Sequence, residues 1–297
     1  MKTTSVAVVV LTHNDFKDTV ECLESVARLD YPSFQVLLVD NHSTDGSIEK
    51  ILARFPALDC VRNGANRGVA GGRNDGWRYV ERHIQCDFVL FLDNDVVLRP
   101  DTLTHLVRVL ETHPDVGIVT GKTYTAPPSD TIMSVGLTVN LYTGYVADVG
   151  SGEHDAGQYD SPREVSACGG FAWLTRAAVF RDLGGLDEAF NPYGWEDVDL
   201  AYRARKRGYR SWCEPSAVLN HKGCKIGRGY VPQYEKYKVE HYFLFLSRHA
   251  SALQKLTCAV CIPFRAAASV MKLLLRGQGS VLRSHLSGAI SSLRRES

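Results

Sequence analysis

Phe91-Leu92-Asp93-Asn94-Asp95 is the stretch from which the fold of this chain is best worked out. It continues an apolar run over residues 88–90, which has the pattern of a buried strand. In an open α/β sheet, ligands bind outside the carboxyl ends of the strands. Two carboxylates one residue apart at such an end therefore favour a hard divalent cation such as Mg²⁺. A polar turn after a strand would use the same residue types, so the triplet alone does not distinguish the two interpretations.

Upstream of this stretch, apolar strands alternate with helical patterns. We expect strands at residues 6–11, 35–39, 58–61 and 86–92, each followed by a loop and then a helix or strand. This alternation is typical of βαβ units and a largely parallel sheet, in which the loops after the strands share one rim. The polar positions that this topology brings to the rim are Thr12, Asn14, Asp40, the segment 66–76, Asp93 and Asp95.

The segment 66–76, with the sequence NRGVAGGRNDG, is rich in glycine and opens a helix. Glycine lets a backbone approach a ligand closely, and a helix N-terminus favours an anion. Together with a carboxylate-bound cation, this predicts a nucleotide that carries a diphosphate. Neither GxGxxG nor GxxxxGK[ST] occurs, which disfavours a dinucleotide fold and a P-loop kinase. Tight packing of the helix on the sheet is the structural alternative for these glycines.

The second half of the chain is less regular. We expect a strand over residues 165–174, with Thr175 capping a helix that runs to Leu183, and hairpins or a mobile loop over residues 132–160. The acids Glu196, Asp197 and Asp199 open a helix whose far end is basic. That order suits the helix dipole, but it also suits a general base presented at a helix start.

His221 follows a further strand and could ligate a metal or be structural. Residues 256–275 are apolar but interrupted by Pro263, and basic residues flank and follow them. Contact of residues 256–295 with an anionic membrane surface competes equally with packing onto the domain or onto a partner chain. No run of 18 uninterrupted apolar residues occurs, so we expect no transmembrane helix.

Composition excludes several classes of protein. The formal net charge is +1, so nothing in the overall charge favours nucleic acid as a partner. Eight cysteines are spread along the chain, and only Cys258 and Cys261 have CxxC spacing, with no second pair to complete a zinc site. This favours reduced thiols in a cytoplasmic protein. No signal peptide is expected at the start of the chain.

Taken together, these motifs resemble the inverting family 2 glycosyltransferases, which have the GT-A fold. The resemblance runs from about Val6 to His249 and rests on five segments. Residues 9–14 resemble the opening strand and nucleotide loop, residues 39–47 the second nucleotide-binding segment, and residues 66–74 the glycine-rich segment. Asp93-Asn94-Asp95 matches the DxD motif, and Trp195-Glu196-Asp197 matches the acceptor-side motif.

The resemblance implies a role for each matching residue. Asp197 would be the catalytic base, with Trp195 and Glu196 on the acceptor side. Asp93 and Asp95 would bind Mg²⁺ or Mn²⁺, together with His221, whose match is looser because the Lys222-Gly223-Cys224-Lys225 context departs from that of relatives. The residues implied in binding the nucleotide sugar are Thr12, Asn14, Asp40, Asn66, Gly68, Arg73 and Asp93.

The implied architecture is an α/β fold with a mostly parallel mixed sheet flanked by helices. A GT-A domain would span residues 1–250, with a nucleotide-sugar half (1–122) and an acceptor half (123–250), followed by an amphipathic helical tail (251–297). The implied reaction is direct displacement. Asp197 deprotonates an acceptor hydroxyl, which attacks the anomeric carbon and inverts it, while the metal stabilises the departing diphosphate.

Within the family the chain looks most like rhamnosyltransferase-type enzymes of cell-surface polysaccharide synthesis. The expected partners are a UDP- or dTDP-sugar donor and a glycan or lipid-linked acceptor, with no nucleic acid. The expected location is the cytoplasm or the inner face of the membrane, and a homodimer is left open. Two alternatives also stay open: a nucleotidyltransferase, and a non-catalytic glycan- or nucleotide-binding protein on the same fold.

Overall fold

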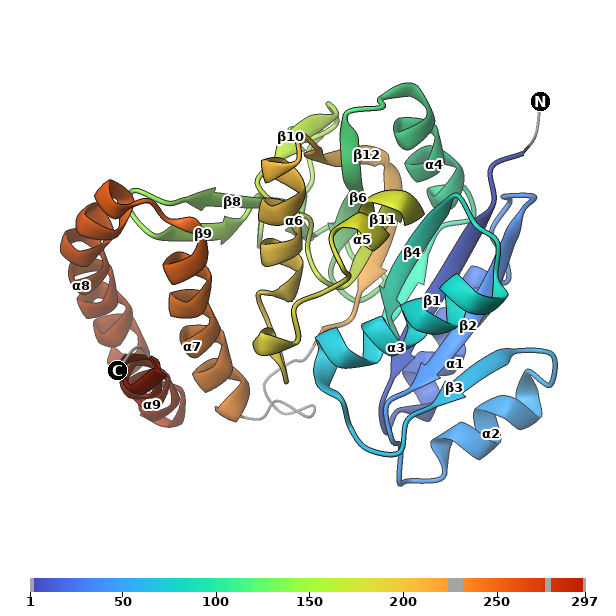
Figure 1. Ribbon diagram of the computed structural model, residues 1–297, viewed down its shortest axis with the longest axis horizontal. Helices are drawn as coiled ribbons and strands as arrows, with labels where there is room; N and C mark the ends of the chain where they lie inside the picture. Colours follow the sequence, from blue (N-terminus) through green and yellow to red (C-terminus); the bar gives the residue numbers. More distant parts are fainter. Residues whose placement is uncertain (1–2, 224–231, 276–278, 296–297) are drawn as a thin grey trace.

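The computed structural model describes residues 3–223, 232–275 and 279–295. A ten-stranded sheet forms its centre, with the strand order β10-β12-β6-β11-β4-β1-β2-β3, β5 paired with β12 and β7 paired with β6 (Figure 1). A separate two-stranded hairpin, β8–β9, projects from it. In the N-terminal part the elements are β1 (Val6–Thr12), α1 (Phe16–Val26), β2 (Phe34–Asp40), α2 (Ser47–Arg54), β3 (Asp59–Arg62), α3 (Gly68–His83), β4 (Phe88–Asp93) and β5 (Val96–Leu98).

The remaining elements carry the chain across the other half of the sheet and into a helical end. They are α4 (Thr102–Thr112), β6 (Val116–Tyr124), β7 (Ile132–Ser134), β8 (Leu137–Asn140), β9 (Tyr145–Asp148), β10 (Arg163–Val165), β11 (Ala172–Arg176), α5 (Ala177–Asp182), the 3₁₀ turn η1 (Glu188–Phe190), α6 (Glu196–Lys206), β12 (Arg210–His221), α7 (Pro232–His249), α8 (Ala252–Leu275) and α9 (Gly279–Arg295).

The N-terminal strands are parallel, as the alternation of strands and helices predicts. β4, β1, β2 and β3 lie side by side in the same direction, so their carboxyl ends share one rim. The register sets Thr12 opposite Asp40 and Leu11 opposite Asp93. The predicted gathering of polar residues at one edge of the sheet is therefore confirmed for these strands.

Side chains of β1 alternate between two buried layers because successive residues of a strand point to opposite faces. Ala7, Val9 and Leu11 pack with residues of α3, α5 and α6, whereas Val6 and Val8 pack with residues of α1, α2 and α4. Both faces of the sheet are thus covered by helices, which explains why the strand sequences are continuously apolar.

Two expectations for the second half are wrong in detail, and a third is confirmed. Residues 165–174 are not one strand: β10 and β11 are separate, and the chain between them, with Gly169 and Gly170, crosses to the rim of the sheet. Thr175 lies inside β11 and does not cap α5, because its hydroxyl donates to the Gly117 carbonyl. Residues 132–160 contain β7 and the hairpin β8–β9, in agreement with the expected hairpins.

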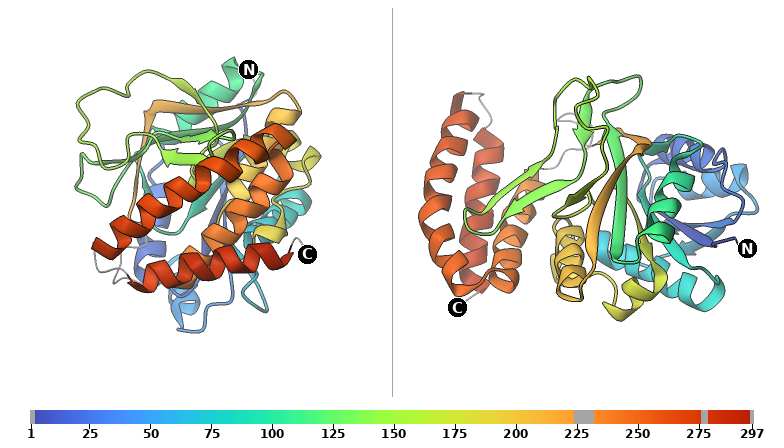
Figure 2. Two further views of the ribbon diagram at one scale, coloured as in Figure 1. Left: turned by 90° about the vertical axis from the view of Figure 1, so that its left-hand side faces the viewer. Right: turned by 90° about the horizontal axis from the view of Figure 1, so that it is seen from above.

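The C-terminal helices α7, α8 and α9 stand at one end of the molecule, and the hairpin β8–β9 reaches from the sheet to them (Figures 1 and 2). Pro263 does not interrupt α8, which is helical over all 24 residues. The sequence, which lacks an uninterrupted apolar run of 18 residues, predicts no transmembrane helix, but α8 is long and apolar enough to cross a membrane. One such helix is weak evidence of a span. The division into residues 1–250 and 251–297 stays a prediction.

Candidate active site

Asp93, Asp95 and His221 meet where β4 and β12 end and β5 begins. Asp93 is the last residue of β4, and the chain turns at once into β5, which pairs with β12 so that Val96 lies opposite His221. His221 Nε2 lies 3.1 Å from Asp95 Oδ1. One ligand atom from each of the three residues falls within a common span of 4.8 Å. Two carboxylates and an imidazole at this separation fit a divalent cation.

Asp95 and His221 each stabilise the charged form of the other. Burial would raise the pKa of Asp95, but the hydrogen bond and charge of His221 outweigh it, so the pKa lies below its ordinary value. Burial would lower the pKa of His221, and the partnership with Asp95 reverses that effect. The His221 ring also stacks on Phe171, with centroids 4.6 Å apart, which fixes its orientation.

Arg73 lies beneath this group and connects it to α6. Its side chain is 1% exposed, and one guanidinium nitrogen, Nη2, donates to Asp93 Oδ1 and to the Gly170 carbonyl, both at 2.5 Å. The other, Nη1, donates to Glu196 Oε1 at 3.2 Å. One buried cation thus holds the carboxylates of Asp93 and Glu196 together. Its expected contact with a nucleotide stays a prediction, because the guanidinium is occupied by these partners.

Asp197 occupies the first turn of α6, next to Glu196. Burial, followed by the charge of Glu196, raises the pKa of Asp197 from 3.8 to about 8. The preceding Trp195 has φ +78°, a left-handed conformation that is unusual for a bulky residue and commonly marks functional sites. A Cβ at Gly170 would lie 3.0 Å from Asp197 Oδ2, so glycine leaves this carboxylate room.

These residues line one hollow of about 340 Å³. The predicted residues that it contains are Arg73, Asp93, Trp195, Glu196, Asp197 and His221. Two further polar residues that the sequence did not reveal also line it: Asp148 of β9 and Lys238 of α7. Burial raises the pKa of Asp148. Neither residue belongs to a recognisable motif, and only the packing of the hairpin β8–β9 and α7 against the sheet brings them here.

The remaining predicted residues lie on the same rim but outside the hollow. Thr12 is buried and shares a hydrogen bond with Thr19, 2.7 Å between the hydroxyl oxygens. The side-chain oxygens of Asn14 and Asp40 accept from the backbone N–H groups of Thr44 (2.7 Å) and Ser43 (2.9 Å). The Asn14–Thr44 bond joins the loops after β1 and β2, whereas the Asp40–Ser43 bond lies within the loop after β2.

Asn66 and Gly68 organise the start of α3. The Asn66 side-chain oxygen accepts from the Gly68 N–H at 2.9 Å and from the Asn41 amide at 3.1 Å. Gly68 has φ +69°, and a Cβ there would lie 2.5 Å from Asn191 Oδ1, so only glycine fits. The structure therefore explains this glycine by close packing as well as by backbone conformation.

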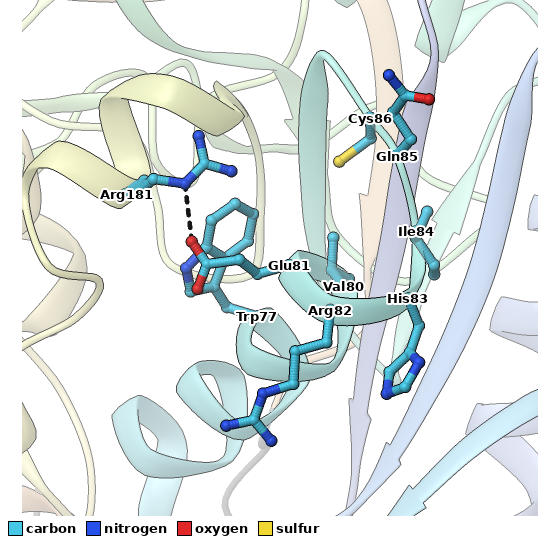
Figure 3. A pocket seen from close by; sticks show the side chains of 9 residues that line it. All are labelled: Trp77, Val80, Glu81, Arg82, His83, Ile84, Gln85, Cys86 and Arg181. Atoms are coloured by element: carbon cyan, nitrogen blue, oxygen red, sulfur yellow. Dashed lines mark hydrogen bonds and ion pairs between the residues drawn. The ribbon is translucent and has the colours of Figure 1, made fainter.

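A second hollow, at the C-terminal end of α3, lies at the opposite end of β4 from Asp93. It measures about 370 Å³, and Figure 3 shows its side chains, among them the Arg181–Glu81 ion pair at 2.7 Å. Cys86 lines it from just before β4 begins. Because it faces the amino ends of the parallel strands, it lacks the position expected for a substrate site.

Comparison with known proteins agrees with this geometry. The family model described as Glycosyl transferase family 2 matches residues 7–184. N-acetylglucosaminyl-diphospho-decaprenol L-rhamnosyltransferase of Mycobacterium tuberculosis (strain ATCC 25618 / H37Rv) is 27% identical over 268 residues, which cover 82% of this chain and 84% of that protein. O-antigen biosynthesis protein RfbC of Myxococcus xanthus is 28% identical over 218 residues, covering 69% of this chain and 16% of that protein.

Solved structures share the fold. The mannosyltransferase PcManGT from Pyrobaculum calidifontis, in complex with GDP-Man and Mn²⁺, superposes with a TM-score of 0.63 and 20% identity over 100% of this chain and 89% of its own. GalNAc-T7 with UDP, GalNAc and Mn²⁺ gives a TM-score of 0.66 and 14% identity, covering 82% of this chain and 48% of that longer one. At these identities the likeness establishes the GT-A architecture alone.

Proposed function

Because the chain belongs to glycosyl transferase family 2, we propose that it moves a sugar from a UDP- or dTDP-sugar to a hydroxyl of a lipid-linked or polymeric cell-surface glycan, with inversion. It is a glycosyltransferase with rhamnosyltransferase relatives. One observation carries the proposal: Asp197 lines the same hollow as Asp93 and His221, two members of the Asp93/Asp95/His221 group. A nucleotidyltransferase is left without support by the family assignment.

Asp197 is the proposed general base. A general base acts best when its pKa lies near the working pH, and a pKa of about 8 places Asp197 in that range. The acceptor hydroxyl gives its proton to Asp197 as its oxygen bonds to the anomeric carbon. The bond from that carbon to the diphosphate breaks on the opposite face. Trp195 and Glu196, on the same turn, border the acceptor.

Asp93, Asp95 and His221 are the proposed ligands of Mg²⁺ or Mn²⁺. Two carboxylates meet the preference of these ions for oxygen, and the three ligand atoms lie within 4.8 Å of one another. When bound, the ion would neutralise the diphosphate of the donor and act as a Lewis acid on the leaving group. Arg73 keeps Asp93 in place from below through its hydrogen bond.

The donor nucleotide is proposed to lie along the rim formed by the loops after β1, β2 and β3. Support comes from the shared register of these strands with β4, which aligns the rim with Asp93. The proposed contacts are Thr12, Asn14, Asp40, Asn66, Gly68 and Arg73.

A cytoplasmic location on the inner face of a membrane is also proposed, through the outer face of α8. Its exposed apolar residues fall on one side at 3.6 residues per turn, each between 57% and 81% exposed. This outer stripe consists of Leu253, Leu256, Val260, Phe264, Met271, Leu274 and Leu275. Neither α8 nor α9 contains an acidic residue, which suits an anionic lipid surface. Arg276 lies outside the described residues, as do the side chains of Lys272, Arg294 and Arg295.

A donor screen by thermal shift tests the site. UDP- and dTDP-sugars would each be added with Mn²⁺, Mg²⁺ or EDTA to wild type, Asp95→Ala and the control Asp182→Ala, which removes an exposed acid of α5 outside the hollow. A ligand raises stability with the logarithm of its concentration over its Kd. A metal-dependent shift with one donor, lost in Asp95→Ala alone, supports the proposal and identifies the donor class.

Absence of a shift with every donor would reject the donor site and favour the non-catalytic alternative. If a donor is found, transfer to a lipid extract or a polysaccharide acceptor is followed by NMR of the new anomeric proton. Retention of configuration would contradict direct displacement with Asp197 as base.

A further inference from the structure

A third hollow, mostly apolar and of about 370 Å³, lies between the hairpin β8–β9 and the three C-terminal helices. Its volume falls within the roughly 300–1,000 Å³ typical of small-molecule sites. Val239, Tyr242 and Phe243 of α7 form one wall, and Ile262 and Ala266 of α8 form another. α9 closes the third side. It packs tightly on α7, since a Cβ at Gly288 would lie 2.5 Å from the Lys236 carbonyl oxygen.

This hollow adjoins the active-site hollow. Val146 of β9 lines both of them. On α7, Lys238 lines the active-site hollow, and its neighbour Val239 lines the apolar one. The two hollows therefore share one strand and one helix as their walls. A ligand that crosses Val146 would have its polar end near Asp197 and its apolar end among the helices.

The two faces of α8 match this arrangement. Its inner face lines the hollow, whereas its outer stripe is exposed. Arg265 stands at the hollow, with its guanidinium 4.8 Å from the centre of the Tyr145 ring, and Lys238, which also pairs with Glu235 at 2.9 Å, is a cation on the active-site side. An amphiphile with an anionic linker between a glycan and a hydrocarbon chain would place that linker between these two cations.

We propose that the apolar hollow binds the hydrocarbon chain of the acceptor lipid, next to its phosphate linker. This rests on the proposed function in one respect, namely that the acceptor is lipid-linked. It adds that the protein itself recognises the lipid. The hairpin β8–β9 and α7 would then guide the acceptor from the hollow between the C-terminal helices to Asp197.

The test measures binding of prenyl monophosphates by calorimetry, in EDTA to silence the metal site and below the micelle concentration. Probes with five, ten and fifteen carbons are compared with inorganic phosphate. The variants Ala266→Trp and Ala289→Trp fill the hollow from α8 and α9. The matched control Ala267→Trp puts the same ring one position along α8, toward the outer stripe. Circular dichroism and thermal melting confirm that each variant folds.

Wild type and Ala267→Trp should bind the fifteen-carbon probe at least about tenfold more tightly than the five-carbon one, since affinity grows with each buried methylene. Both filling variants should lose that gain. Equal binding by all four proteins, or no gain with chain length in wild type, would overturn the proposal.

The outcomes separate this inference from the proposed function. If a donor raises the melting temperature but the length of the prenyl chain has no effect on binding, the lipid hollow alone is rejected. Chain-dependent binding that the filling variants abolish, without any donor shift, keeps the hollow and rejects the transferase site.

Discussion

Replacing Asp197 with asparagine should abolish transfer and yet stabilise the fold at neutral pH. The folded protein holds this carboxyl protonated up to a pKa of about 8, against 3.8 ordinarily. Between these two values the folded state binds one proton more than the unfolded chain, so wild-type stability falls as the pH rises. Asparagine is neutral at every pH and escapes that cost.

The magnitude follows from the displacement of the pKa. A pH of 7 lies about 3 units above the ordinary pKa of 3.8, and the folded protein keeps the carboxyl protonated over that interval. At about 1.4 kcal/mol per unit, the cost to wild-type stability is at most about 4 kcal/mol. Because Asp197 is only half-buried and opens onto the hollow, screening reduces this, and we expect about 1–2 kcal/mol. For a chain of this size that gain corresponds to a Tm higher by roughly 2–6 °C.

Denaturant titrations of wild type and Asp197→Asn at several pH values measure the difference directly. The difference should be near zero at about pH 4, grow through neutrality and level off above about pH 8. The exposed Asp182→Asn controls for loss of a carboxylate elsewhere. A difference independent of pH, or a wild type that is the more stable at pH 8, would show that Asp197 is ionised throughout and would refute the reasoning from burial.

Three more predictions follow from contacts already described. Arg73→Met should destabilise the fold by about 3–5 kcal/mol, because it removes the cation shared by half-buried Asp93 and buried Glu196; urea unfolding measures the loss, and a loss below 1 kcal/mol would contradict the bridge. Gly72→Ala should cost about 1–3 kcal/mol, since its Cβ would lie 2.7 Å from Leu11 Cδ1, and unchanged stability would show that α3 shifts freely. Phe264→Glu should reduce co-sedimentation with anionic vesicles, whereas an effect on gel-filtration mass instead would assign the outer stripe to a second copy of the chain.

The N-terminal half of the fold is predictable from sequence because its signals are local. A continuous apolar strand that ends in Asp40 or Asp93 predicts both a buried strand and a polar residue at the rim of the sheet. Because the strands are parallel, both aspartates then lie on the same rim. The same reasoning fails for residues 165–174, where apolar residues around Gly169 and Gly170 look like one strand. The break is imposed by a distant partner, since Gly170 must accommodate Arg73 and Asp197.

The candidate site was predictable to the extent that its residues belong to motifs. Asp93, Asp95 and His221 do meet, as expected, and Asp197 lines the same hollow as Asp93 and His221. The bridging position of Arg73 was not predictable, because nothing in a helical glycine-rich segment shows that its arginine points inward to two carboxylates. Asp148 and Lys238 were missed because the hairpin and α7 that carry them reach the hollow only through tertiary packing.

The sheet runs without a break from the rim proposed for the donor to the side proposed for the acceptor, because antiparallel β11 is hydrogen-bonded to β4 on one side and to β6 on the other. The two substrates therefore do not meet across a hinge, as they would between two lobes that open and close. Any movement that admits them must come from structure attached to the sheet's edge, such as the hairpin β8–β9 and α7. Changes of acceptor preference can accordingly accumulate in those two elements while the framework that aligns Asp93 with Asp197 stays rigid.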